Sequence, residues 1–206
     1  AYSFKALREE IKAIETTLGV NLENIPTSPA LNSDDYNFAA QTPGGSLSVG
    51  SNTITMTPCP RGVAGTNTRQ YMYLSAGTGT PEAGLITGGT CTPGAATGTL
   101  IVSVANTHSG AWTIQSATVG IYEAALSLPA AGGTVLIPAG THQLRAAVPF
   151  KEHWSFRGMG ATTKIVPASS NAVVFESHLS ANPSAQVDTP KDGVEFSDFM
   201  IDGHAY

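Results

Sequence analysis

Carboxylates are the most versatile chemical groups near the end of this chain. Hydrolysis of a glycosidic bond needs two carboxyl groups that face one groove, about 5–5.5 Å apart for retention and about 6.5–9.5 Å apart for inversion. Asp198 and Asp202 flank the final strand-like segment and can point outward. We expect solvated or turn-forming carboxylates here and assign no catalytic residue. The acids considered are Glu176, Asp188, Asp192, Glu195, Asp198 and Asp202.

The spacing of the other residues predicts neither a metal site nor a nucleotide-binding site. Gly158-x-Gly160 lacks the third glycine of a dinucleotide fingerprint, because Thr163 stands there. Trp154 lies in an apolar segment and is expected in the core. We therefore expect no cofactor and no metal. The histidines show no ligand spacing and are expected on the surface or in turns: His108, His142, His153, His178 and His204.

The composition excludes several classes of partner. The chain has 206 residues, a hydrophobic content of 41%, a charged content of 12% and a net charge of −5. Binding to nucleic acid or to an anionic membrane needs a basic stripe, and the ten Lys and Arg residues are scattered. No segment approaches the roughly 20 apolar residues of a membrane span. We expect no nucleic-acid partner and no membrane insertion.

Cys59 and Cys91 are too few for a disulfide scaffold and match no zinc spacing. We expect two half-buried thiols, with a single bridge as the alternative.

Short apolar runs between turn residues dominate the last two-fifths of the chain. Val135–Ile137 lies between Gly132-Gly133 and Pro138-Ala-Gly140, which predicts a short buried strand. Further strands are predicted at 142–148, 153–157, 163–166, 172–176 and 194–201, with a bend at Ser197-Asp198. Strands this short, with little helix between them, predict a chain that winds repeatedly as a coil.

A helix is predicted over 117–130, immediately before the first of these strands, with Ser116 or Thr118 as its cap. A helix there covers the open end of a coil and protects its strand edges. The residues expected to cap the coil are Ile121, Ala124, Ala125 and Leu128.

The first half of the chain divides into three parts. Residues 1–20 contain a predicted helix over 3–18, and its heptad seam either folds back on its own chain or, as we favour, self-associates. Residues 21–43 are predicted to form an extended linker along a neighbouring subunit, anchored by Tyr36 and Phe38. Residues 44–116 predict five short strands in a small antiparallel sandwich or barrel. The expected oligomer contacts are Phe4, Leu7, Ile11, Ile14 and Leu18.

Almost no charge occurs between Thr87 and Gln115. A polar but uncharged surface of this kind often serves as a packing surface between subunits. The predicted fold class is therefore mainly β, with a short N-terminal helix, a small β-domain, and a capping helix with the first coils of a β-helix in 117–206.

Three segments follow one another in an order typical of a known superfamily. They are Ile121-Tyr-Glu-Ala-Ala-Leu126, Gly132-Gly-Thr-Val-Leu-Ile-Pro-Ala-Gly-Thr141 and Phe156-Arg-Gly-Met-Gly-Ala-Thr-Thr-Lys-Ile165. In this order residues 117–203 resemble the N-terminal end of pectate-lyase-like right-handed parallel β-helices. Separately, Leu7–Asn21 is similar to a short helical motif of phage tail-fibre and spike proteins.

The two resemblances together imply the N-terminal region of a phage tailspike or tail fibre. Such a virion protein is a homotrimer that docks to a tail or baseplate protein and carries a β-helix that binds or cleaves host cell-surface polysaccharide. We expect the chain to continue beyond Tyr206 and any depolymerase activity to lie there. The alternative is a secreted bacterial polysaccharide lyase or glycosidase of the pectate-lyase-like superfamily.

Overall fold

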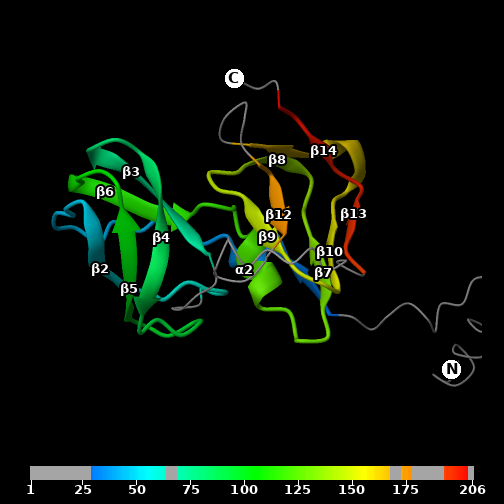
Figure 1. The fold of residues 1–206 in the computed structure, drawn as a ribbon, viewed down its shortest axis with the longest axis horizontal. Coiled ribbons are helices and arrows are strands. Elements are labelled where there is room, and N and C mark those ends of the chain that lie inside the picture. Colours follow the sequence, from blue (N-terminus) through cyan, green and yellow to red (C-terminus); the bar gives the residue numbers. More distant parts are fainter. Residues whose placement is uncertain (1–28, 64–68, 168–172, 178–192, 204–206) are drawn as a thin grey trace, which may run out of the picture.

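The computed structural model describes residues 29–63, 69–167, 173–177 and 193–203, and the fold is mainly β. Figure 1 shows two groups of strands side by side, with helix α2 (Ile121–Leu126) in the second group. The predicted helix over 3–18 and its five seam residues lie outside the described part. Within the described residues, no helix is both long enough and apolar enough to cross a membrane.

The first group is a five-stranded antiparallel sheet that curls around a core containing Met56, Met72, Leu74 and Trp112. The five predicted strands are all present, although among the described residues no second sheet packs on them as a sandwich would require. Two isolated bridges join the segment before β2 to β6 and to the residue just before it, Gln41 to Ile114 and Leu47 to His108, so the sheet curls back toward its first strand. The strands are β2 (Gly50–Met56), β3 (Tyr71–Thr78), β4 (Glu82–Gly89), β5 (Gly98–Val104) and β6 (Ser109–Ser116), in the order β2-β5-β4-β3-β6.

Gln41 links the two outer strands of this sheet. Its backbone exchanges two hydrogen bonds of 2.9 Å with Ile114 of β6. Its side-chain amide accepts from the Thr57 N–H at 2.9 Å and donates to the Pro58 carbonyl at 2.8 Å, just beyond β2. The side-chain amide of Gln41 thus acts as a peptide group of a neighbouring strand would. It satisfies the Thr57 N–H and the Pro58 carbonyl, which would otherwise lack a backbone partner.

Replacing Gln41 with Ala is expected to lower the free energy of unfolding by about 1–2 kcal/mol, because two backbone groups lose their partners. Urea denaturation measures the change, with Thr42→Ala, an exposed neighbour, as the control. Equal stability of both variants would contradict the linking role of Gln41.

Cys59 and Cys91 form a disulfide, with their Cα atoms 5.5 Å apart, so the expectation of two thiols is wrong. The bridge joins the segment after β2 to the segment before β5. It packs against Gly98, where an added Cβ would lie 2.6 Å from the Cys59 sulfur. The sequence left this pairing open because it depends on how the sheet brings the two segments together.

The double variant Cys59→Ala/Cys91→Ala is expected to be less stable than the oxidised protein by about 3–4 kcal/mol, since the bridge closes a loop with a sequence separation of 32 residues. Thermal unfolding of the variant, and of the wild type with and without reductant, measures this. If all three samples unfold alike, the bridge does not constrain the unfolded chain.

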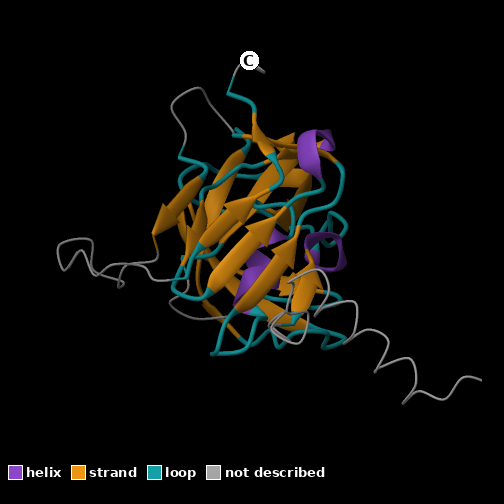
Figure 2. Cartoon of the chain, turned by 90° about the vertical axis from the view of Figure 1, so that its right-hand side faces the viewer, coloured by secondary structure: helices purple, strands orange, loops and turns teal. Residues whose placement is uncertain are grey.

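The second group consists of short parallel strands in three sheets. Two successive rounds of the chain each place one strand in each sheet: β7, β8 and β9 are followed by β10, β11 and β12. The next described round adds β13 and β14 to two of the sheets. Figure 2, turned by 90° from Figure 1, shows strands as orange arrows that lie one beside another. The bounds are β7 (Gly133–Leu136), β8 (Gly140–Gln143), β9 (Val148–Phe150), β10 (Trp154–Arg157), β11 (Thr163–Val166), β12 (Phe175–Ser177), β13 (Glu195–Ser197) and β14 (Met200–Ile201).

One strand boundary predicted from the sequence is confirmed by this winding, and one predicted strand is wrong. The bend between Ser197 and the next strand is confirmed, because Asp198 has a φ of 59° and separates β13 from β14. The single strand predicted over 142–148 is wrong: β8 and β9 are separate strands in different sheets. The chain changes direction between them, and no glycine or proline in 142–148 marks that change.

The inward side chains of one sheet form a column. Leu31, Val135, Phe156 and Phe196 are register partners on successive strands. The rings of Phe156 and Phe196 stack with their centroids 5.5 Å apart and their planes inclined by 7°. Trp154 is 2% exposed beside this column, so its predicted core position is confirmed.

Residues 29–43 differ from an extended linker. Strand β1 (Ala30–Asn32) pairs in parallel with β7, and a 3-10 helix, η2 (Ser33–Tyr36), follows it. Tyr36 packs against the core of the parallel strands and Phe38 against that of the antiparallel sheet. Both aromatic anchors therefore contact their own chain.

Helix α2 is shorter than the predicted 117–130 segment, and neither Ser116 nor Thr118 caps it. Its N-cap is Gly120, with a φ of 81° and its Cα packed against the Ser33 carbonyl. The Ser116 hydroxyl accepts from the backbone N–H groups of Thr118 and Gly120 instead. The predicted capping residues all lie in the core shared with Val135 and Ile137: Ile121, Ala124 and Ala125 are 0% exposed and Leu128 is 7% exposed.

Candidate functional site

A groove of about 480 Å³ lies where the strands β1, β7 and β10 end. Its walls combine apolar and polar side chains, which is typical of binding sites. The residues that matter most are Asn32, Leu136, Pro138, Arg157, Met159 and Asp198.

The strand register builds the groove. Asn32, Leu136 and Arg157 are neighbours on β1, β7 and β10, each one residue beyond a member of the inward column. Successive side chains of a strand point to opposite faces, so these three point outward together. Leu136 is 40% exposed and Met159 is 69% exposed, which leaves an apolar surface on the groove.

The turn Gly158-Met159-Gly160 is held tightly against the next round of the chain. The N–H groups of Gly158 and Gly160 donate to the carbonyls of Ser197 and Asp198 at 2.9 and 2.7 Å. A side chain at Gly158 would overlap the Asp198 carbonyl. Close backbone approach therefore explains Gly158, whereas Gly160 has open space around it and is explained by its φ of 76°.

Thr163, which stands in place of a third glycine, fixes the same turn. Its hydroxyl accepts from the Met159 N–H at 2.8 Å and donates to the Pro138 carbonyl at 3.1 Å. Thr163 is completely buried, and it ties the two sides of the groove together.

Arg157 and Asp198 form the charged part of the groove. The Arg157 Nε donates to the Asp198 Oδ2 at 2.9 Å, and the two side chains are 62% and 49% exposed. Such exposed pairs contribute little to stability. Among the described residues, no acceptor is recorded for the two terminal nitrogens of Arg157, which can therefore donate to ligand oxygens.

The chemistry that the groove can support depends on its carboxylates and possible metal ligands. Within the described residues, Asp198 is the one carboxylate that lines it, whereas glycoside hydrolysis needs two. No group of three His, Cys, Asp or Glu residues that could hold a metal was found in the described part.

The other predicted acids do not gather at the groove. Glu176 forms an ion pair with Arg69 at 3.8 Å, and Glu195 is exposed on β13. The Asp202 N–H donates to the Ile165 carbonyl after β14. Asp188 and Asp192 lie outside the described residues.

Glu123 is a fully buried acid that the sequence analysis missed. Burial raises its pKa, and the hydrogen bonds that it accepts from the Thr118 hydroxyl at 2.6 Å and from the Gln70 amide at 3.4 Å offset this only in part. Perturbed acids often mark active sites. This one is 0% exposed between α2 and the start of β3, so it joins the two groups of strands.

Replacing Glu123 with Gln is expected to remove a pH dependence of stability. The pKa of Glu123 is higher in the folded protein than its usual value of about 4.5. Its carboxyl therefore costs no stability below about pH 4.5 and destabilises the fold as the pH rises toward the folded pKa. Urea denaturation at pH 5 and pH 8 should show a larger loss in the free energy of unfolding for the wild type than for Glu123→Gln, because only the wild type has a carboxyl to ionise at this position.

Glu195→Gln is the matched control, because Glu195 is exposed, and it should follow the wild type. If Glu123→Gln loses as much stability as the wild type between the two pH values, Glu123 is not protonated in the fold.

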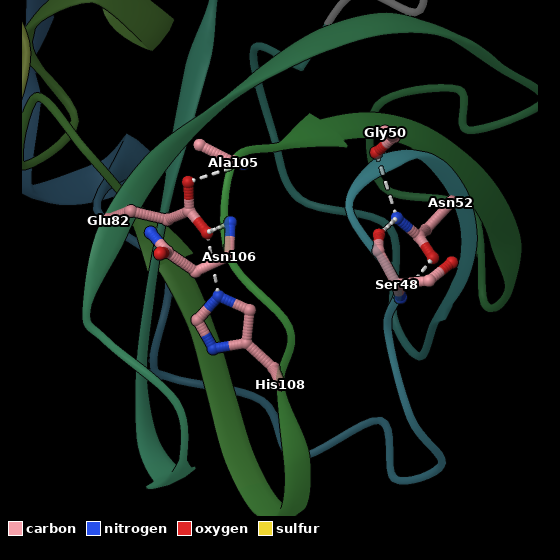
Figure 3. Close-up of polar contacts among 7 residues, drawn as sticks. All are labelled: Ser48, Gly50, Asn52, Glu82, Ala105, Asn106 and His108. Carbon is pink, nitrogen blue, oxygen red and sulfur yellow. Dashed lines mark hydrogen bonds and ion pairs between the residues drawn. The ribbon is translucent and has the colours of Figure 1, made fainter.

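Glu82 and His108 form a second polar cluster, shown in Figure 3. Partial burial raises the pKa of Glu82, but hydrogen bonds from the Ala105 N–H, His108 and the Asn106 N–H, all between 2.7 and 2.9 Å, outweigh it and lower the pKa. The cluster fixes the turn between β5 and β6. In the same figure, the Asn52 side chain holds the turn before β2 through Ser48 and Gly50.

The surface or turn position expected for the histidines is wrong for His142, which lies in β8, is 8% exposed and has its Nε2 2.9 Å from the Pro138 carbonyl. His108 adjoins the turn between β5 and β6, but it is buried, with an exposed fraction of 1%. His153 is exposed, as predicted. His178 and His204 lie outside the described residues.

Comparisons of this chain with protein-family models, curated proteins and solved structures found no match.

Proposed function

We propose that this chain is part of a phage tailspike or tail fibre, a virion protein whose wound strands bind a host cell-surface polysaccharide. The observation that carries the proposal is the succession of parallel strands, in which two successive rounds each place one strand in each of three sheets and the next described round adds β13 and β14 to two of them. We interpret this winding as the first coils of a right-handed parallel β-helix, with β1 and α2 covering its first coil.

The last round supports this interpretation. Phe196, Met200 and Ile201 are 41%, 40% and 50% exposed, and Phe196 and Ile201 pair with Phe156 and Ile165 of the preceding round. A further coil with apolar residues in the same columns would bury them, with a gain of about 25 cal/mol for each Å² covered.

The groove is proposed as the polysaccharide site. Leu136 and Met159 offer apolar contact to the C–H faces of a sugar ring, while Asn32 and the terminal nitrogens of Arg157 hydrogen-bond its oxygens. The predicted helix over 3–18 is proposed to hold a homotrimer and to dock on a tail or baseplate protein.

The secreted polysaccharide lyase or glycosidase is the second candidate, and the Cys59–Cys91 disulfide favours it. Disulfides persist mainly in oxidising, extracellular environments. The single carboxylate of the groove argues for binding by the described residues over cleavage.

Binding of the full chain to a panel of immobilised capsular and O-antigen polysaccharides tests the proposal. We expect at least one polysaccharide to be retained, and Arg157→Ala to weaken its binding about tenfold or more, which corresponds to about 1.4 kcal/mol. Lys164→Ala is the control, because Lys164 is a cation on β11 that does not line the groove.

The proposal fails if no polysaccharide binds, or if Arg157→Ala binds as the wild type does. Release of reducing or unsaturated sugar ends by this chain would favour the enzyme instead.

A further inference from the structure

The antiparallel sheet has an unusual charge distribution. Its five strands contain one charged residue, Glu82. Between residues 37 and 116 the other charged residues are Arg61, in the segment after β2, and Arg69, which pairs with Glu176 of β12. The Glu82 side chain is 12% exposed and is bonded to the turn between β5 and β6. None of the three lies on the outward surface of the sheet centre.

Strand alternation defines an uncharged face on the side of the sheet opposite its core. The face consists of Thr53, Tyr71, Leu85, Thr87, Ile101 and Ser103, all exposed or half-buried. Its members adjoin across the strands, since Thr53 pairs with Ile101, and Leu85 pairs with Tyr71 and with Ser103. The neighbouring Tyr73 is covered by the Arg145 guanidinium, 4.8 Å from its ring centroid, which marks one border of the face.

A surface that stays in water typically draws about 25–35% of its residues from charged types. The centres of protein interfaces are instead depleted in charge and enriched in aromatic residues. The uncharged face combines tyrosine, aliphatic and hydroxyl side chains with no charge, in a chain whose net charge is −5. It therefore has the composition of an interface.

We propose that the uncharged face is a contact surface for a second copy of this chain. A charged partner surface would lose its hydration against this face and find no counter-charge there. The partner surface must therefore be uncharged as well, and this face is itself such a surface. Because the acidic residues lie elsewhere, copies that meet here avoid the repulsion of their net charges.

The inference rests on the homo-oligomer of the proposed function and names the surface that forms it. The mass of the full chain in solution, measured by sedimentation or light scattering over a concentration series, tests it. The wild type is expected at a multiple of 21.2 kDa at micromolar concentration. Ile101→Lys places a charge at the centre of the face and is expected to raise the dissociation constant about tenfold or more.

Val49→Lys is the matched control, because Val49 is 65% exposed in the turn before β2 and lies off the face. It should keep the wild-type mass. Thr53→Lys repeats the test at a second position of the face, and circular dichroism with thermal unfolding verifies that each variant is folded.

The outcomes separate the possible explanations. An oligomer that Ile101→Lys and Thr53→Lys both leave intact overturns this inference. If Ile11→Lys then dissociates it, the predicted helix holds the copies together and the proposed homo-oligomer survives. A monomeric wild type overturns both the face and the homo-oligomer, while polysaccharide binding is measured independently.

Discussion

Parallel pairing forces Leu31, Val135, Phe156 and Phe196 into one inward column, and the groove depends on that register. Side chains alternate along a strand, so a slip of one residue would exchange the buried and exposed sets. The buried aromatic stack makes such a slip costly, because Phe156 is 0% exposed. The outward positions of Leu136 and Arg157 therefore follow from the apolar interior, and the groove surface follows from their positions.

The parallel strands are also tied to the antiparallel sheet by polar contacts. Glu123 of α2 bonds Gln70 and Thr118, and the Arg145 N–H donates to the Ala117 carbonyl. These hydrogen bonds offset the cost of burying the acid, so they add little net stability. An arrangement that left the buried acid without its partners would cost several kcal/mol, so the hydrogen bonds determine where the two groups of strands meet. Gly120 completes the junction, because its φ and its contact with the Ser33 carbonyl exclude a side chain.

The sequence predicted elements whose causes are local. Alternation and turn residues indicated the five antiparallel strands, and the interruption at Ser197-Asp198 indicated a change of sheet. The features it missed depend on distant segments. Strand β1 has three residues and no period of its own, and its pairing with β7 comes from more than a hundred residues along the chain. The Cys59–Cys91 bridge and the burial of His108 likewise depend on which strands adjoin. For the groove, the sequence singled out Gly158-x-Gly160 and Asp198 separately, but their meeting is set by the register of β10 and β13.

Mapping a bound oligosaccharide onto the chain by nuclear magnetic resonance tests most directly whether the groove is the binding site. With a fragment of a retained polysaccharide, we expect the amide signals of Leu136, Gly158 and Met159 to shift on titration, together with the side-chain signals of Arg157. Shifts confined to residues away from the ends of β1, β7 and β10, such as the outward face of the antiparallel sheet, would contradict it.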